Sequence, residues 1–458
     1  MTLKTILLAG TALGMAAMLA APANAATATS NEIEALKAQM MEMQQRLQDM
    51  EVQYSNKLNT IQKTQDEAVV VGLKDGRPTF ATADGRFTFG ITGRAHLDTG
   101  FYEQNTASRV AVGNMEGNAN FRRVRLGFGG TVMKDGLYNI ELNMGDSGLE
   151  KDAAIYEAVV HYKGFDGVLL TLGATKPKMT MDDSTSSNDI TFIERSTAAN
   201  LATSFAAGEA RMTAGGQYNN ENFFAAAYYT MGAAGAATGA DFDTSNVVGR
   251  VAYAFAPTKG ANLHFGASGA HAFNLPTGTI RLRDRPELRV DARRLIDANF
   301  GANAAESATT YGPELAFSYG PFRAQGEYYR YQVNRTVGAD ADFDAWYLQA
   351  SYVLTGEAYK YDIKKAAYSG VKPSAPLMTG GIGAWEIAAR YSQADLNDIG
   401  SGVIGGEQDI ITLGLNWYPG NNVRFMMNYL NVKVDDYGAV LGRDVSHDAF
   451  ALRTQFSF

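Results

Sequence analysis

The last segment of the chain constrains the fold most, because its two faces differ in polarity. An extended strand over this segment places Phe450, Leu452, Phe456 and Phe458 on one face and Arg453, Gln455 and Ser457 on the other. A soluble domain rarely exposes such a strand at its end. A barrel that turns one face to lipid and the other to water requires it. We therefore expect an all-β protein that crosses a membrane with strands.

The same period-two alternation recurs upstream and predicts sixteen strands. They lie near 87–102, 121–133, 137–145, 153–163, 168–175, 209–218, 223–231, 246–255, 263–274, 309–319, 322–334, 344–355, 384–395, 408–418, 422–434 and 448–458. An even strand number is typical of an antiparallel transmembrane β-barrel, here residues 87–458. A soluble sandwich or propeller would also alternate, but no blade repeat is present.

Short turns and long loops alternate between the predicted strands, as they do in transmembrane barrels. The short turns include Lys134-Asp135-Gly136, Gly320-Pro321 and Pro419-Gly420-Asn421. Both ends of the barrel then lie on the short-turn side, which we expect to face the periplasm. Residues 356–383 should form a short turn but are long, so they hold either a hidden strand pair or a real periplasmic insertion.

The N-terminus predicts secretion. Lys4 precedes an apolar run from Ile6 to Ala20, and Ala23-Asn24-Ala25 has the small residues of a cleavage site. We interpret residues 1–25 as a signal peptide, since the run is short for an uncleaved membrane helix. With a barrel behind it, this predicts the bacterial outer membrane. The chain has no cysteine, which excludes disulfides and zinc–thiolate sites.

Residues 31–66 change to a period of seven, which predicts a helix with an apolar seam. One heptad position holds Ile33, Met40, Leu47, Tyr54 and Ile61, and the other holds Leu36, Met43 and Met50, with Lys57 as the one break. Asn31 and Glu34 resemble a capping box. We expect a periplasmic coiled coil, which is a trimer if each barrel projects one helix from the same membrane face, followed by a glycine-rich linker at 72–86. The alternative is one amphipathic helix that lies on its own barrel.

Alternation also assigns charged side chains to the lumen. Phe89, Ile91 and Leu97 have lipid parity, which places Arg94, His96 and Asp98 inside. The following strands place Arg123, Arg125, Arg211, Arg250 and Arg390 inside, whereas Arg122 has lipid parity and fits only near the membrane rim. Several arginines in one wet channel would attract anions. The alternative is a wall in which arginines pair with acids such as Glu141, Glu157 and Glu209.

Two long loops carry further basic residues. Loop 176–208 contains Lys176 and Lys178, which are candidate phosphate binders if the loop folds into the lumen and not over the surface. The fifth long loop holds Arg281, Arg283, Arg285, Arg289, Arg293 and Arg294, interrupted by acids. This run is either an anion funnel or an ordinary solvated surface.

No pattern predicts catalysis. The five histidines, His96, His161, His264, His271 and His447, lack metal spacing, and no serine, histidine and acid stand out as a triad. We expect no enzyme activity, cofactor or metal. The net charge of −8 at pH 7 argues against a nucleic-acid partner.

Four stretches also resemble one family. Phe121–Gly127, Thr185–Arg195, Leu354–Glu357 and Leu413–Pro419 are similar to characteristic segments of the phosphate-selective porins O and P of Gram-negative outer membranes. The resemblance covers residues 75–458. It implies a homotrimer of sixteen-stranded barrels, an inward third loop, and an arginine ladder that includes Arg123 and Arg125 and leads to a constriction near Lys176 and Lys178.

The leading functional hypothesis is therefore a porin in outer-membrane lipid that lets small anions, phosphate or polyphosphate, diffuse passively. The candidate anion-binding residues are Arg94, Arg123, Arg125, Lys176, Lys178, Arg211 and Arg250. A general non-selective porin is one alternative. The other is an envelope-tethering protein whose coiled coil contacts the cell wall or a periplasmic partner.

Overall fold

The computed structural model describes residues 30–66, 68–74, 76–145, 153–234, 244–275, 277–301 and 304–458. The predicted signal peptide lies outside these ranges. The chain divides into two compact units, Met1–Ala68 and Val69–Phe458.

The described part of the first unit is a long helix, α2 (Ser30–Asp66), where the heptad pattern predicted it. The apolar side chains of both heptad positions, such as Ile33 of one and Leu36 of the other, are exposed along it. No helix in the described part of the chain is both long enough and apolar enough to cross a membrane. The helix is confirmed, and the coiled coil stays a prediction.

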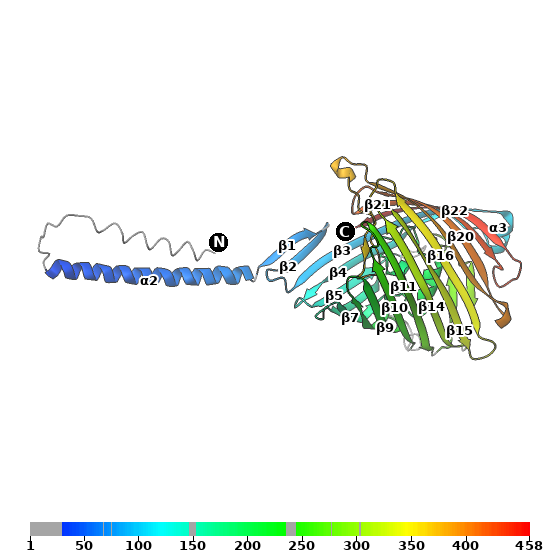
Figure 1. The fold of residues 1–458 in the computed structure, drawn as a ribbon, viewed down its shortest axis with the longest axis horizontal. Helices are drawn as coiled ribbons and strands as arrows, with labels where there is room; N and C mark the ends of the chain where they lie inside the picture. Colours follow the sequence, from blue (N-terminus) through cyan, green and yellow to red (C-terminus); the bar gives the residue numbers. More distant parts are fainter. Residues whose placement is uncertain are drawn as a thin grey trace. The chain divides into compact units, whose positions relative to one another are not determined.

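In the second unit, sixteen antiparallel strands form a closed barrel (Figure 1). Each strand pairs with its neighbour along the barrel, and the last pairs with the first, with Arg453 opposite Asp98. The strands are β3 (Thr88–Gln104), β4 (Asn118–Val132), β5 (Gly136–Asn143), β6 (Ala154–Tyr162), β7 (Val168–Thr175), β8 (Arg211–Asn219), β9 (Phe223–Ala233), β10 (Ser245–Phe255), β11 (Ala261–Asn274), β14 (Ala305–Tyr319), β15 (Phe322–Arg335), β16 (Ala341–Val353), β19 (Ala384–Asp398), β20 (Val403–Tyr418), β21 (Val423–Asp435) and β22 (Val445–Ser457). All sixteen predicted segments are strands.

The two faces of the wall differ as the alternation predicted. On β22, Phe450 and Leu452 are exposed on the outer face, whereas Arg453 and Gln455 are buried on the inner face. The outer face is the lipid-contacting surface, and the inner face packs against chain segments that fold into the barrel. These inward segments position the candidate site.

A short hairpin precedes the barrel where the sequence predicted a linker. Its strands are β1 (Val69–Lys74) and β2 (Arg77–Thr82), and β2 continues along β3 with Phe80 opposite Phe89. Part of the expected 72–86 linker is therefore sheet. The alternation there is only a few residues long, and glycines interrupt it, which hid it from the sequence pattern.

Three segments enter or cover the barrel interior. Loop 176–208 carries helices α4 (Met181–Ser184) and α5 (Thr197–Thr203), and most of its side chains are buried. The fifth long loop forms a hairpin of β12 (Arg281–Asp284) and β13 (Ile296–Asn299), which contacts α5 and β20. Of the smaller helices, α3 (Thr106–Val112) lies in the loop between β3 and β4, and η2 (Ile399–Ser401) lies in the tight connection between β19 and β20.

The third segment is the long connection 356–383. It contains the two-residue strands β17 (Tyr361–Asp362) and β18 (Ala367–Tyr368), which pair only with each other, and the turn η1 (Leu377–Thr379). It is a real insertion at the end of the barrel that holds the short turns, because Tyr359 N–H donates to the carbonyl of Gly320 at 3.2 Å. We call this end the short-turn end.

Candidate functional site

The carboxylate of Glu194 binds loop 176–208 to the wall through several arginines. Its oxygens accept from Arg122 Nε at 2.9 Å, Arg453 Nη2 at 2.9 Å and Arg123 Nη1 at 3.4 Å, and Arg289 Nε lies 3.6 Å away. Burial alone would raise the pKa of Glu194, but these guanidinium groups hold that pKa well below its usual range. Glu194 therefore remains an anion at the centre of an arginine cluster.

The position of Arg122 corrects the sequence prediction. Arg122 was placed on the lipid face, yet its side chain is buried inside and bonds Glu194. The pairing of β3 with β4 shifts at this point, with His96 opposite Arg123 and Leu97 opposite Phe121. Arg122 is the extra residue of a β-bulge, and a bulge changes the parity of every residue that follows on its strand.

Other wall arginines bind the backbone of the same loop. Arg424 Nη1 donates to the carbonyl of Ile190 at 2.7 Å, and Arg390 Nη1 donates to the carbonyl of Glu194 at 3.1 Å. Arg390 also forms an ion pair with Glu287 of the fifth long loop. These arginines hold the inward segments in place, so their charge is largely committed to the protein itself.

Beside the clamped loop, four contiguous cavities run from the fifth long loop to the short-turn end. Their volumes are about 310, 270, 200 and 340 Å³, and each shares lining residues with the next. Lys176 and Arg195 line the first and second, Arg125 the second and third, and Arg94 the second, third and fourth. We call these four cavities the passage. Basic side chains outnumber acidic ones in the lining of each.

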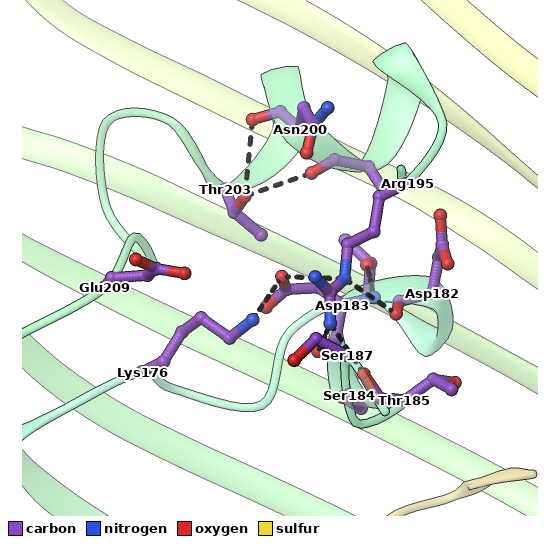
Figure 2. Close-up of polar contacts among 12 residues, drawn as sticks. Lys176, Asp182, Asp183, Ser184, Thr185, Ser187, Arg195, Asn200, Thr203 and Glu209 are labelled. Atoms are coloured by element: carbon purple, nitrogen blue, oxygen red, sulfur yellow. Dashed lines mark hydrogen bonds and ion pairs between the residues drawn. The ribbon is translucent and has the colours of Figure 1, made fainter. Parts of the chain in front are cut away.

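The start of loop 176–208 lines the first and second cavities of the passage. Lys176 Nζ contacts Asp183 Oδ1 at 2.6 Å, and Arg195 Nε lies 3.5 Å from the same carboxylate (Figure 2). Arg195 also donates to the carbonyl of Thr185 at 2.6 Å, which fixes the turn around α4. Arg94 faces this turn from the wall and donates to Ser187 Oγ at 2.5 Å.

Acids neutralise part of the wall, as the alternative interpretation proposed. Arg125 forms ion pairs with Glu141 at 3.4 Å and with Glu209 at 3.3 Å, and its guanidinium stacks on Tyr156. Glu157 does not pair with an arginine, because it accepts from Asn139 and Thr175. By contrast, none of the carboxylates that the structure describes lies within ion-pair distance of Arg94.

Five of the seven candidate residues line the passage: Arg94, Arg123, Arg125, Lys176 and Lys178. Burial, and then the charge of Lys365, lowers the pKa of Lys178 to about 8. Its amine donates to the carbonyl of Lys364 at 3.3 Å, which joins loop 176–208 to the segment from the short-turn end.

The other two candidates lie elsewhere. Arg250 is fully buried in an ion pair with Glu314 at 2.8 Å, and it donates to the carbonyls of Lys365 and Ala366. Arg211 donates to the carbonyls of Met231 and Ser204. Neither lines the four cavities, so both have the geometry of structural clamps.

The arginine run of the fifth long loop splits into two groups. Arg283, Arg285, Arg289 and Arg294 line the first cavity of the passage. Arg281 and Arg293 pair with Asp297 and Asp291 of the same loop. The funnel and surface interpretations therefore each apply to part of the run.

Four basic residues of the last cavity were not among the candidates: Arg77, Lys365, Lys372 and Arg424. Inner parity on β21 was a usable signal for Arg424. Nothing in the local sequence marked the other three, because they come from the hairpin and from the insertion. The described residues include no group of three or more histidine, aspartate or glutamate side chains placed to hold a metal ion.

Known proteins resemble this barrel in sequence. The family model for the phosphate-selective porins O and P matches residues 89–458, which is nearly all of the barrel. This chain belongs to that family. The porin is 30% identical over 429 residues to Porin O of Pseudomonas aeruginosa, covering 86% of this chain and 94% of the relative. It is also 31% identical to an uncharacterized protein of Caulobacter vibrioides, covering 77% and 70%.

Solved structures share the architecture of this porin at low identity. An anion-selective porin from Comamonas acidovorans superposes with a TM-score of 0.52 at 14% identity, covering 81% of this chain and all of the other. OmpT of Vibrio cholerae gives a TM-score of 0.51 at 13% identity, covering 81% and 98%. These matches establish the barrel fold, and the family establishes an outer-membrane porin.

Proposed function

We propose that this porin conducts small inorganic anions, including phosphate or polyphosphate, by passive diffusion through the passage. The observation that carries the proposal is the excess of basic over acidic side chains in the lining of all four cavities. An anion entering from the fifth long loop would meet this excess along the whole route. A cation would meet an electrostatic barrier.

Within this route, basic side chains without an acidic partner should attract an anion most strongly. Ion-paired arginines such as Arg125 supply donors but little net field, whereas Arg94 has no carboxylate within ion-pair distance among the described residues. Arg94 and the half-buried Lys178 both line the second cavity. They are the groups that we expect to replace part of the hydration shell of an anion. Membership in the phosphate-selective porin family supports the conduction of anions, and an anion-selective porin from Comamonas acidovorans has the same barrel fold.

Planar-bilayer recordings test the proposal. Under a potassium chloride gradient, the reversal potential should show higher anion than cation permeability, and added phosphate should reduce the chloride current. Arg94→Ala should lower the anion preference several-fold. Arg330→Ala is the matched control, because Arg330 sits on the outer wall in an exposed pair with Asp342 at 3.3 Å.

Two results would contradict the proposal in different ways. A preference for cations in the wild-type protein would contradict the proposed anion selectivity. Anion preference without any effect of phosphate would leave a small-anion porin with no phosphate site. A non-selective diffusion porin is the second candidate, and the pairing of Arg125 with Glu141 and Glu209 favours it.

For the assembly, we propose a homotrimer in which α2 forms a coiled coil in the periplasm. The exposed apolar seam of α2 supports this, since a lone helix with such a seam lacks cover for it. The trimer form of OmpT offers a precedent among structures with the same barrel fold. Contact of α2 with the cell wall or with a periplasmic partner remains the tethering alternative.

A further inference from the structure

The insertion at the short-turn end has an uncharged stretch that lies outside the barrel. The thirteen positions from Pro373 to Trp385 contain no charged residue, although Lys372 and Glu386 flank them. Loops in water normally carry charged or strongly polar side chains. Ser374 and Thr379 are the two hydroxyl residues of this stretch, and the rest is apolar, proline or glycine.

The stretch forms a protrusion with an apolar tip. Its backbone is held by hydrogen bonds from Leu377 N–H to the carbonyl of Pro419 at 2.8 Å and from Gly383 N–H to the carbonyl of Ala375 at 2.9 Å. At the tip, the side chain of Met378 is 98% exposed, and Leu377 and Ile382 are 51% and 65% exposed. Figure 1 shows the turn, in gold, standing out from the barrel near the C-terminus.

The protrusion adjoins an aromatic row on the lipid-facing wall. Trp385, Trp417 and Phe425 lie opposite one another on β19, β20 and β21, with ring centroids 5.5 and 5.4 Å apart. Trp417 Nε1 donates to the carbonyl of Ile382 at 2.9 Å, so the row and the protrusion are directly joined. Tryptophan gathers at the membrane–water interface, which places this row at the membrane rim of the short-turn end.

We propose that the tip, Leu377, Met378 and Ile382, inserts into the lipid leaflet at the short-turn end and anchors the barrel there. The tip is continuous with an outer wall that already contacts lipid, and it lacks the charges that would oppose insertion. Three side chains form too small a patch for a stable contact with a second copy, which needs about 800 Å² from each partner. Lipid is therefore the occupant that fits.

Site-directed fluorescence in vesicles tests the proposal. The chain has no cysteine, so Met378→Cys carries a single label. With the protein in phosphatidylcholine–phosphatidylglycerol vesicles, doxyl-labelled phosphatidylcholine should quench a label at Met378→Cys strongly, and aqueous iodide should quench it weakly. Leu452→Cys on the outer wall is the lipid control, and Val337→Cys in an 80% exposed turn is the water control.

Two outcomes would overturn the proposal. Iodide quenching equal to that of Val337→Cys, without doxyl quenching, would place the tip in water. Protection from both quenchers, with thiol cross-linking between subunits, would place it against a second copy. Ile382→Cys repeats the measurement at an independent position. The result does not depend on ion selectivity, so it stands or falls separately from the proposed transport function.

Discussion

At the scale of single residues, the arginines on the inner face of the barrel divide by what their guanidinium groups bind. Arg390, Arg424 and Arg453 bind carboxylates or carbonyls of the inward segments, whereas Arg94 faces the passage with one hydroxyl partner, Ser187. The first kind stabilises the inward segments, and we expect the second kind to be available to an anion. Sequence alone places both kinds on the inner face and does not separate them.

Arg250 offers the clearest test of this division. Arg250→Gln should leave the buried Glu314 without its ion-pair partner and release the carbonyls of Lys365 and Ala366. Breaking such a pair costs about 3–5 kcal/mol. We expect a lower free energy of unfolding in urea and noisier single-channel currents with no loss of anion preference. A stable variant with reduced anion preference would instead make Arg250 part of the passage.

The pH dependence of conduction should report on Lys178. Its pKa is lowered from 10.5 to about 8, mainly by burial, so its charge is present below pH 8 and lost above it. The anion preference of the wild-type porin should therefore fall between pH 7 and 9. Lys178→Arg should show no such fall, because a guanidinium stays charged. Reversal potentials measured at both pH values decide this.

Loss of folded protein would not explain a fall in anion preference between pH 7 and 9. The folded state loses the Lys178 proton at a lower pH than the unfolded state does. This group alone therefore makes the free energy of unfolding rise between pH 8 and 10.5. A pH-dependent loss that persisted in Lys178→Arg would point to another titrating group.

At the scale of elements, the sixteen strands follow from alternation because each strand faces lipid on one side and packed or wet interior on the other. Segment 168–175 has the same bounds in the structure as in the prediction. The failures occur where that rule stops applying. A bulge reverses the parity of Arg122, and the hairpin from Val69 to Thr82 is too short for its period to show.

The candidate site was predictable only in part, for a related reason. Arg94, Arg123 and Arg125 lie on strands, where parity fixes direction. Arg77 and Lys372 reach the passage from a hairpin and an insertion, where no period exists and only the packed chain brings them together. Charge type was readable from the sequence, but the partners that neutralise a charge were not.

The apolar seam of helix α2 can be tested by substitution. If its seam mediates trimerisation, Leu47→Lys should lower the trimer fraction in detergent, because it places a charge in the apolar interface. Gln45→Lys, at the heptad position farthest from the seam, is the matched control and should leave the trimer intact. Light scattering measures the mass of both. Equal masses for the two variants would contradict trimerisation through α2 and would favour the tethering role.

At the scale of the whole molecule, the net charge of the chain and the charge of its passage have opposite signs. The chain carries −8 at pH 7, yet basic residues dominate all four cavities. Selectivity thus depends on where charges are placed and not on their sum. An ion inside the passage is within a few ångströms of the wall, whereas the acids on the outer surface are separated from it by protein and screened by salt.

This arrangement predicts how selectivity depends on ionic strength. The Debye length falls from about 10 Å at 0.1 M to about 3 Å at 1 M salt. If the field of the wall attracts anions, the anion preference measured with the same concentration ratio across the bilayer should drop over that range. If anions are instead selected by direct hydrogen bonds to Arg94 and Lys178, the preference should persist at 1 M and disappear only in the double variant Arg94→Ala/Lys178→Ala. Reversal potentials of the wild type and of Arg330→Ala, which should agree at every salt concentration, provide the reference.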